Sequence, residues 1–598
     1  MLNFTTASAA DAIERMYRDP LPSSRSGALY NAFSYPTKIS PEIIALFIAT
    51  HTKPGDRILD TFSGSGTTGV AALLCDKPTQ QMLDLADRLG VSPLWGPRHA
   101  DLVDVGTLGC FIAKVMTSPP DPEEFRRAAA RLAARARDWL GDLYRVDDDT
   151  GSAGEIRHVI WSEVVVCPDC DSEHPLWDVA VSRDPAAFLS DFTCPSCGKN
   201  ERVDACPRAT TVTEDVFGRK VEARLRVPVE VHGVTGSRKW RRKASANDRH
   251  SEEWKAVTLP DGAPDVAITW GELHRSGYHF GMDRLHHFYT PRNFVAMAVC
   301  LELAGDEPEP MASALRFLVL SYNATHSTVM TRIVAKKNQP DFVLTGAQSG
   351  VLYVSGLPVE KNIIRGIERK AKVIADAFEV VHGSRSSATV HNTSSENLPL
   401  DDRSVDYIFT DPPFGDYIPY AELNQINELW LNDLTERSAE TVVSKSGGKD
   451  ADHYEASMTR VFAEAARVLK HDGRATVVFH SAKARIWQAL TRAYGSAGFG
   501  VSRTSVLDKI QASFKQVVST VSVKGDPLIL LEKGAAATSA TLAENLLGGV
   551  ERDFRKSGSS DVRPFFSRYV AESLEAGLPI TLDASTFASR LIGGDVAA

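Results

Sequence analysis

The sequence lacks any long apolar run. No stretch of about 18 consecutive apolar residues, the length that a membrane-spanning helix needs, occurs among its 598 residues. Its first residues, Met1-Leu2-Asn3-Phe4-Thr5-Thr6, also lack the basic segment followed by an apolar one that marks a secretory signal peptide. We therefore expect a cytoplasmic protein with no membrane partner.

Cysteine is scarce and neither sign of charge dominates. The chain has eight cysteines, too few for a disulfide scaffold. Its net charge of −9, hydrophobic content of 43% and charged content of 24% are ordinary for a globular protein. The negative net charge gives no indication of nucleic-acid binding, although a local basic face can lie on an acidic protein. No internal repeat is found, and low complexity is confined to Gly534-Ala535-Ala536-Ala537.

What is present is an alternation of strands and helices that is interrupted once. Residues 1–149 and 385–533 show this alternation, which predicts a doubly wound α/β sheet with right-handed crossovers. Strands are predicted at residues 57–60, 404–410, 474–479, 501–506 and 528–532. Residues 150–290 have short strands and no helical periodicity, so we interpret them as an inserted domain. Residues 291–384 are predicted to be helical, with helices at 312–329 and 358–378, and residues 534–598 to form a helical tail.

Two short motifs follow strands of this predicted sheet. The first is Asp60-Thr61-Phe62-Ser63-Gly64-Ser65-Gly66-Thr67-Thr68, whose glycines let the backbone approach a ligand and turn into a helix N-terminus. The second is Asp411-Pro412-Pro413-Phe414. Either motif alone also fits a simple turn or a proline-stiffened loop. Both follow strands of one sheet, and we expect them to meet at neighbouring strand ends in a single cleft.

The pair of motifs resembles the two that define the S-adenosylmethionine (SAM)-dependent methyltransferases of exocyclic base amines. Together with the cysteine pairs Cys167/Cys170 and Cys194/Cys197, it is similar to the adenine-specific DNA methylases that contain a Zn-ribbon, over roughly residues 30–533. His287-Phe288-Tyr289-Thr290-Pro291-Arg292-Asn293-Phe294 resembles another block of that family. The resemblance implies a Rossmann-like SAM-dependent methyltransferase sheet with an inserted Zn-ribbon or target-recognition domain at 150–290.

The same resemblance implies where SAM would bind. The backbone of the first motif would cradle the methionine end of the cofactor, and the segment from Phe33 to Lys38 would cover it. These implied cofactor residues are Lys38, Asp60, Phe62, Gly64, Ser65, Gly66, Thr67 and Thr68.

A Rossmann-like sheet also needs an acid after its second strand for the ribose hydroxyls. The usual offset falls on Asp84 or Asp87, in a polar helical stretch, and we prefer Asp104. Asp101 is interpreted as a solvent-facing acid. Family members often use another acid before the catalytic strand for adenine, and here no carboxylate appears until Glu396.

The second motif suits methyl transfer to an amine whose lone pair is delocalised into a base. Asp411 can accept one amine hydrogen and the carbonyl of Pro412 the other, while Pro413 holds Pro412 away from helical angles. Phe414 offers an apolar face to a base that has left the duplex stack. The chain has no Pro-Cys dipeptide, which disfavours a cysteine nucleophile for C5 methylation.

Four cysteines form two pairs of the form Cys-Pro-x-Cys. Cys167 and Cys170 are followed, after 23 intervening residues, by Cys194 and Cys197. Four thiolates at this spacing suit a closed, tetrahedral, structural Zn²⁺ site. An iron–sulfur centre and an idle set of thiols are the alternatives, and His174 and Cys206 are substitute ligands with poorer spacing. The basic run 237–243, which contains Trp240, fits either a phosphate-binding and base-stacking segment or a solvated loop.

We therefore predict a SAM-dependent DNA methyltransferase that forms N6-methyladenine on a flipped-out base, with Asp411, Pro412, Pro413 and Phe414 as its catalytic residues. A restriction-modification or antiphage setting, with other subunits, fits this prediction. N4-cytosine methylation remains the near alternative, because the same geometry serves both amines. An RNA base methyltransferase, for example for guanine N2 of tRNA, and a non-catalytic SAM- or DNA-binding subunit also remain open.

Overall fold

The computed structural model describes residues 9–18, 21–23, 26–249, 252–337, 339–415, 418–509, 526–534 and 543–592. The chain forms two compact units. Unit 1 comprises residues 1–119, 377–421 and 435–598, and unit 2 comprises residues 120–376 and 422–434. Among the described residues, no helix is both long and apolar enough to cross a membrane.

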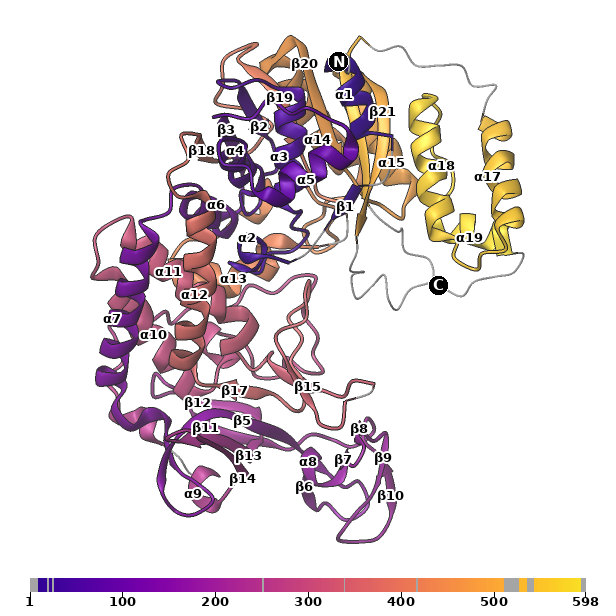
Figure 1. Cartoon of the computed structure of the whole chain (residues 1–598). Coiled ribbons are helices and arrows are strands. Elements are labelled where there is room, and N and C mark those ends of the chain that lie inside the picture. The colour runs from indigo at the N-terminus through magenta and orange to yellow at the C-terminus, as the bar shows by residue number, and fades with distance from the viewer. Residues whose placement is uncertain are drawn as a thin grey trace. The chain divides into compact units, whose positions relative to one another are not determined.

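Unit 1 is built around an eight-stranded sheet (Figure 1). Its order is β1 (Leu21–Ser23), β21 (Phe499–Lys509), β22 (Asp526–Lys533), β20 (Leu469–Val478), β19 (Val405–Thr410), β2 (Arg57–Asp60), β3 (His99–Asp104) and β18 (Ser387–Asn392). Strand β22 is antiparallel to both of its neighbours, and every other pairing in the sheet is parallel. This confirms the predicted α/β class with a parallel-rich sheet.

Helices cover both faces of this sheet because successive strand residues point to opposite sides. On β19, Tyr407 stacks on His51 and Phe409 contacts Phe47, both from α3 (Pro41–His51), at centroid distances of 4.8 and 5.7 Å. Between them, Ile408 joins the opposite core, which contains residues of α14 (Ala451–Val468) and α15 (Ala484–Ser496). The remaining unit 1 helices are α1 (Ala9–Met16), α2 (Ala28–Asn31), α4 (Thr67–Asp76), α5 (Gln80–Leu89), α6 (Thr107–Thr117), α17 (Ala543–Ser557), α18 (Arg563–Glu575) and α19 (Ala584–Ile592).

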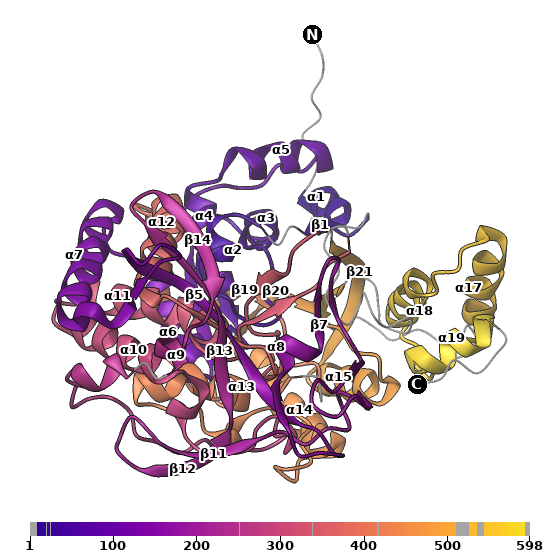
Figure 2. The ribbon, with the colours of Figure 1, turned by 90° about the horizontal axis from the view of Figure 1, so that it is seen from below.

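The C-terminal helices belong to the core of unit 1. Side chains of α17, α18 and α19, including Val550, Phe566 and Phe587, join the same apolar cluster as α14 and α15. These three helices form one group, shown in yellow in Figures 1 and 2. The predicted helical tail therefore contributes apolar side chains to the core of unit 1.

Unit 2 combines an antiparallel sheet with a group of helices. Its long central strand β5 (Ala153–Val166) pairs with β13 (Arg226–Thr235), β17 (Val359–Lys361), β4 (Arg145–Asp147) and β6 (Glu173–Pro175), and β13 also pairs with β14 (Arg238–Lys243). Four short hairpins accompany the sheet: β7 (Val181–Arg183) with β8 (Ala186–Phe188), β9 (Asp191–Thr193) with β10 (Asn200–Arg202), β11 (Thr210–Glu214) with β12 (Lys220–Arg224), and β15 (Arg332–Val334) with β16 (Val343–Thr345). Its helices include α7 (Pro122–Leu140), α8 (Leu176–Val179), α9 (Ala246–Arg249), α10 (Pro291–Gly305), α11 (Met311–Tyr322), and most of α12 (Ile363–Val381) and of α13 (Tyr420–Leu431).

Several expectations about this region were wrong. The strands of 150–290 are not all short, since β5 has 14 residues and β13 has 10. The predicted helix 358–378 begins only at Ile363, after strand β17, and the predicted helix 312–329 ends at Tyr322 in a π-turn over residues 323–327. There the side chain of Asn323 donates to the backbone carbonyl of Ile426, so a tertiary contact replaces the helical continuation.

The basic run 237–243 is a strand and not a solvated loop. Trp240 is buried against Gly233, where its ring would clash with any Cβ, so it cannot stack on a base. Arg238 pairs with Asp148 and Asp149, and Arg242 pairs with Asp248 at 2.6 Å. Arg238 and Arg242 thus already have carboxylate partners, whereas Lys239, Arg241 and Lys243 are exposed.

Candidate active site and metal centre

The two sequence motifs meet at the carboxyl ends of adjacent parallel strands. Strands β2 and β19 pair directly, with Ile58 opposite Tyr407 and Leu59 opposite Ile408. Just beyond, the hydroxyls of Thr61 and Thr410 lie 2.9 Å apart. In open α/β sheets, ligands bind outside the carboxyl ends of the strands. The predicted convergence of the two motifs in one place is therefore confirmed.

Asp60 holds the loop that follows β2. Its carboxylate accepts hydrogen bonds from the backbone N–H of Phe62 at 3.1 Å and from the hydroxyl of Thr68 at 2.5 Å. Burial raises the pKa of Asp60 to about 6, because desolvation disfavours the charged form. This carboxylate spans the loop from its first residues to the start of α4.

Asp104, at the end of β3, holds the middle of the same loop. It accepts hydrogen bonds from the backbone N–H groups of Gly64 and Gly106, each at 2.7 Å. Burial raises its pKa above the usual value. The acid predicted for the ribose thus lies beside the glycine loop, as that prediction requires.

Asp101 is not the solvent-facing acid that we expected. Its side chain is 4% exposed and pairs with Arg57 at 2.5 Å and with His391 at 3.0 Å. It points from the middle of β3 into a polar contact between neighbouring strands. Because successive side chains of a strand point to opposite faces, Asp101 and Asp104 lie on opposite faces of β3, and Asp101 has a structural role.

The two glycines of the loop serve different purposes. Gly66 has φ +76°, and a Cβ there would lie 2.5 Å from the Cβ of Ala113, so it allows α4 and α6 to pack closely. Gly64 has φ +48°, and a Cβ there would meet only the ring of Tyr35, at 3.2 Å. Gly64 is half-exposed, whereas Ser63 and Ser65 are buried, so another group can approach the loop at Gly64 even though its N–H is held by Asp104.

The other predicted loop residues complete the turn into α4. Ser65, Thr67 and Thr68 are buried, and Phe62 is half-buried against the core shared with α14 and α15. The hydroxyl of Ser63 is buried and has no hydrogen-bond partner among the described residues. A buried polar atom without a partner is costly, and it points to a polar group that the loop receives from a ligand.

The segment from Phe33 to Lys38 lies beside the loop, as the resemblance implied. The ring of Tyr35 faces Gly64 and stacks with that of Tyr420, at a centroid distance of 6.3 Å. The ammonium of Lys38 donates to the carbonyls of Leu29 and Tyr30, at 2.9 and 3.3 Å. Lys38 thus ties this segment to the end of α2, and Tyr35, which sequence reasoning did not select, faces the glycine loop.

The Asp411–Phe414 turn is held by side chains from later segments of the chain. The hydroxyl of Tyr454, on α14, donates to the carbonyl of Pro413 at 2.7 Å. Phe414 packs edge-on against Phe479 and His480, at 5.7 and 5.8 Å. No hydrogen bond to the carbonyl of Pro412 occurs within the part of the chain that the structure describes. The motif itself gives no sign of Tyr454, because this residue lies far from it in the sequence.

Strand β18, which sequence reasoning did not predict, ends next to Asp104. The side-chain amide of Asn392 donates to the backbone carbonyl of Asp104 at 3.1 Å. Glu396 is engaged elsewhere, since it pairs with Arg460 at 2.6 Å and accepts from Ser457 at 2.5 Å. The adenine end of the implied cofactor site therefore has no carboxylate from this segment.

Cys167, Cys170, Cys194 and Cys197 form one cluster in unit 2. Their sulfur atoms all lie within 4.8 Å of one another, with Cys167–Cys197 and Cys170–Cys194 at 3.8 Å. A tetrahedral zinc with Zn–S bonds of about 2.3 Å places its sulfurs about 3.8 Å apart. The cluster thus has the dimensions of a closed, four-sulfur metal site.

The surroundings of the cluster suit thiolate ligands. Backbone N–H groups turn inward at both knuckles, where Asp171 and Gly198 adopt φ of +55° and +77°. Nε2 of His174 lies 3.5 Å from the sulfur of Cys194, close enough to orient a ligand from outside the set. Cys206 contributes to the adjacent apolar core and not to the four-sulfur group.

Comparison with known proteins places the first motif in a family context. Residues 10–77 match the model of the N6_N4_Mtase family, described as DNA methylase. This match includes the Tyr35 segment and the glycine loop, and it ends before Asp104 and Asp411. No curated protein matches the chain.

Solved methyltransferases are similar over about a quarter of the chain. A SAM-dependent methyltransferase from Methanosarcina mazei is 12% identical with a TM-score of 0.14, and the match covers 25% of this chain and 68% of that one. Geranyl diphosphate C-methyltransferase from Streptomyces coelicolor A3(2) is 12% identical with a TM-score of 0.16, covering 27% of this chain and 60% of that one. TM-scores this low carry no argument about the chemistry of this chain.

Proposed function

We propose that this protein is a SAM-dependent DNA methyltransferase that methylates the N6 amine of adenine. The observation that carries the proposal is the meeting of the glycine loop and the Asp411–Phe414 turn at adjacent strand ends. The DNA methylase family model, which matches the chain through the glycine loop, supports the same reaction class. The match to that model does not distinguish N6-adenine from N4-cytosine, so the choice of adenine rests on the resemblance of the motifs.

The residues around the glycine loop fit a polar, flexible cofactor such as SAM. The unpartnered hydroxyl of Ser63 and the approachable backbone at Gly64 would hold its amino-acid end, beneath the ring of Tyr35. Asp104 would receive the ribose hydroxyls, because a carboxylate has about four acceptor positions and two are used by backbone N–H groups. When bound, SAM would supply an electrophilic methyl group on a sulfonium.

The Asp411–Phe414 turn would orient the base amine. Asp411 and the carbonyl of Pro412 would each accept one amine hydrogen, which directs the nitrogen lone pair toward the methyl carbon. The nitrogen would take the methyl group, with the C–S electron pair left on the departing neutral thioether, and the carboxylate of Asp411 would accept the proton that the amine loses. Tyr454 takes the neighbouring carbonyl of Pro413, which holds that of Pro412 in a fixed direction. Catalysis would rest on positioning and electrostatics.

The zinc prediction extends to unit 2. We propose that Cys167, Cys170, Cys194 and Cys197 bind a structural Zn²⁺, since their sulfur separations match a tetrahedral site and four thiolates leave no position open for water. The division of the chain into five functional segments, with 150–290 selecting the target, also belongs to this proposal.

The test is methyl transfer from isotope-labelled SAM to duplex DNA, followed by nucleoside analysis with mass spectrometry. Wild type should yield N6-methyladenine, and Asp411→Ala should lower the rate by about 100-fold or more, as expected when a positioned polar contact to the reacting group is lost. SAM affinity, measured by calorimetry, should change little. Asp401→Ala, which removes an exposed carboxylate near the same strand, is the matched control.

The outcomes separate the parts of the proposal. Labelled N4-methylcytosine would overturn the target base and leave the reaction class standing. Transfer to tRNA but not to DNA would overturn the substrate. An Asp411→Ala variant as fast as wild type would reject the assigned catalytic role.

A further inference from the structure

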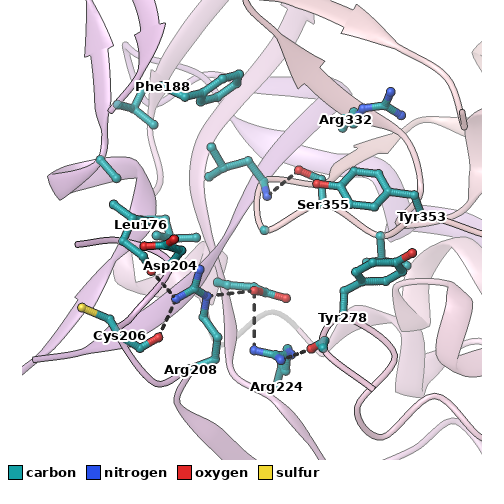
Figure 3. Close-up of a pocket in the computed structure, with 18 of the residues that line it drawn as sticks. Leu176, Phe188, Asp204, Cys206, Arg208, Arg224, Tyr278, Arg332, Tyr353 and Ser355 are labelled. Atoms are coloured by element: carbon teal, nitrogen blue, oxygen red, sulfur yellow. Dashed lines mark hydrogen bonds and ion pairs between the residues drawn. The ribbon is translucent and has the colours of Figure 1, made fainter. Parts of the chain in front are cut away.

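Unit 2 contains a pocket of about 810 Å³, which lies within the size range of small-molecule sites. One wall comes from the region of the cysteine cluster, including Leu176, Phe188 and Cys206, and the opposite wall carries Tyr278 and Tyr353 (Figure 3). The rings of Tyr278 and Tyr353 meet edge to face at 5.0 Å, and Phe188 is 48% exposed. Large aromatic faces are thus presented to the pocket from two sides.

Arginines gather at the lower edge of this pocket, where the carboxylate of Asp204 is already paired with Arg202. Glu163 is surrounded by Arg208, Arg224 and Arg226, whose guanidinium nitrogens lie 3.4, 3.9 and 3.2 Å from its carboxylate. Three cations thus share one buried anion. The Nε–H of Arg224, which lines the pocket, is buried and has no hydrogen-bond partner within the described part of the chain. A buried cationic donor in this state favours an incoming anion.

Arg332 adds a further cation at the upper edge (Figure 3). Its guanidinium lies over the ring of Tyr353 at 5.4 Å, and its hydrogen bonds, to the carbonyl of Gly346 and to Gln348, are long, at 3.3 and 3.4 Å. Its contacts among the described residues include no carboxylate within ion-pair distance. Arginine in this arrangement combines a stacking surface with a charge available for a phosphate.

The positive charge continues beyond the pocket. Gly346, which accepts from Arg332, packs against the ring of His326, and Nδ1 of His326 lies 3.1 Å from the ammonium of Lys361. Burial and the nearby Arg369 guanidinium lower the pKa of Lys361 to about 8, so this cation lacks compensating charge. Cations on both edges of an aromatic pocket suit a polyanionic strand better than an isolated small molecule.

We propose that this pocket receives one nucleotide of a nucleic-acid strand, with the base on the aromatic rings and the phosphates on Arg224 and Arg332. This assignment rests on the proposed function, because a DNA methyltransferase is what brings nucleic acid to the protein. The pocket shares its apolar core with the cysteine cluster, since Cys167 and Cys194 pack in one group with Leu176 and Leu357. Metal binding would thereby shape the wall against which the base lies.

The test uses the full chain with its metal and needs no cofactor. Binding of a fluorescein-labelled single-stranded oligonucleotide is followed by anisotropy for wild type, Arg332→Ala and Tyr353→Ala. Each variant should weaken binding by about tenfold, since one stacked base contributes this much in single-strand sites. Arg131→Ala, which removes an exposed arginine of unit 2 paired with Glu307, should bind like wild type. Unchanged metal content and thermal unfolding verify that the variants fold.

Photo-cross-linking locates the contact directly. An oligonucleotide with 5-iodo-2′-deoxyuridine should cross-link to peptides that contain Tyr278 or Tyr353. Deoxyadenosine monophosphate, titrated alone, separates the two sources of a nucleotide: sensitivity of its binding to Arg332→Ala with no oligonucleotide binding would assign the pocket to a free nucleotide. Cross-links confined to other regions, or variants that bind both probes like Arg131→Ala, would overturn the pocket assignment.

Failure here is distinguishable from failure of the proposed function. Oligonucleotide binding that depends on Arg332 in a protein without methyl transfer would keep the pocket and reject the enzyme. Methyl transfer that is unaffected by Arg332→Ala and Tyr353→Ala, with equal oligonucleotide binding, would keep the enzyme and reject the pocket.

Discussion

Replacement of Gly66 by alanine tests whether close packing of two helices shapes the cofactor loop. Gly66 has φ +76°, and an added Cβ would lie 2.5 and 2.7 Å from the Cβ and Cα atoms of Ala113 on α6. These atoms belong to the backbone and to a short side chain, so neither can rotate away. Gly383, with φ +75° and no atom within 4 Å of its added Cβ, is the matched control in the same unit.

Both substitutions lower the free energy of unfolding through backbone strain, and only Gly66→Ala adds a steric clash. A left-handed conformation costs an alanine about 1–2 kcal/mol relative to glycine, and this applies to both positions. Overpacking against a rigid neighbour adds about 1–3 kcal/mol, and this applies only to Gly66. We therefore expect Gly66→Ala to destabilise unit 1 by about 2–5 kcal/mol and Gly383→Ala by about 1–2 kcal/mol.

Urea unfolding of the two variants measures this difference, and calorimetry with SAM measures its consequence. Because both glycines lie in unit 1, the same unfolding transition reports on both. Gly66→Ala should also lose SAM affinity, since α4 must move away from α6 and carry the loop with it, whereas Gly383→Ala should retain it. Equal destabilisation by the two substitutions would refute the packing argument.

Three further changes probe other parts of the molecule. Tyr454→Phe leaves the carbonyl of Pro413 without its hydrogen bond, so we expect stability to fall by about 1–2 kcal/mol. We also expect a slower methyl-transfer rate at unchanged SAM affinity. An unchanged rate would contradict the positioning role of Tyr454. Lys361→Met should raise the free energy of unfolding near neutral pH by up to about 3 kcal/mol, because the pKa of Lys361 is lowered to about 8 and its charged form is disfavoured in the folded state. Stability of the wild type should accordingly rise with pH between about 8 and 10.5, where the unfolded chain binds the extra proton, and equal urea midpoints of variant and wild type near neutral pH would refute this. Cys167→Ser should lower the zinc content measured by plasma mass spectrometry and destabilise unit 2, whereas Cys206→Ser, outside the four-sulfur group, should retain the metal.

The sequence was sufficient to predict the core of the sheet and the meeting of the two motifs. Strand 57–60 is reproduced residue for residue as β2, and the strand predicted at 404–410 begins one residue later as β19. Both strands carry consecutive apolar residues, Ile58-Leu59 and Tyr407-Ile408-Phe409, and an acid, Asp60 or Asp411, stands at or just after the strand end. Adjacency then follows from the rule that ligand-binding loops gather at the carboxyl edge of the sheet.

The remaining features depend on contacts between residues that are remote in sequence. Strand β18 has only weak alternation, and it is a strand because it pairs with β3 at the edge of the sheet. Asp101 differs from Asp104 through Arg57 and His391, which local sequence does not place beside it. Tyr454 reaches Pro413 from a helix that follows the motif by some 40 residues, and no local pattern marks it.

The carboxylates of Asp60 and Asp104 were identified from the sequence, but the loop groups to which they are bonded were not. Both acids spend hydrogen-bonding capacity on the loop itself: Asp60 binds Phe62 and Thr68, and Asp104 binds Gly64 and Gly106. Burial raises the pKa of each, so the loop is held by charges that are short of solvation. A cofactor hydroxyl that donates to Asp104 would relieve part of this shortage while the backbone contacts remain. The same desolvation would therefore favour a hydroxyl-bearing ligand over an anionic one at this position.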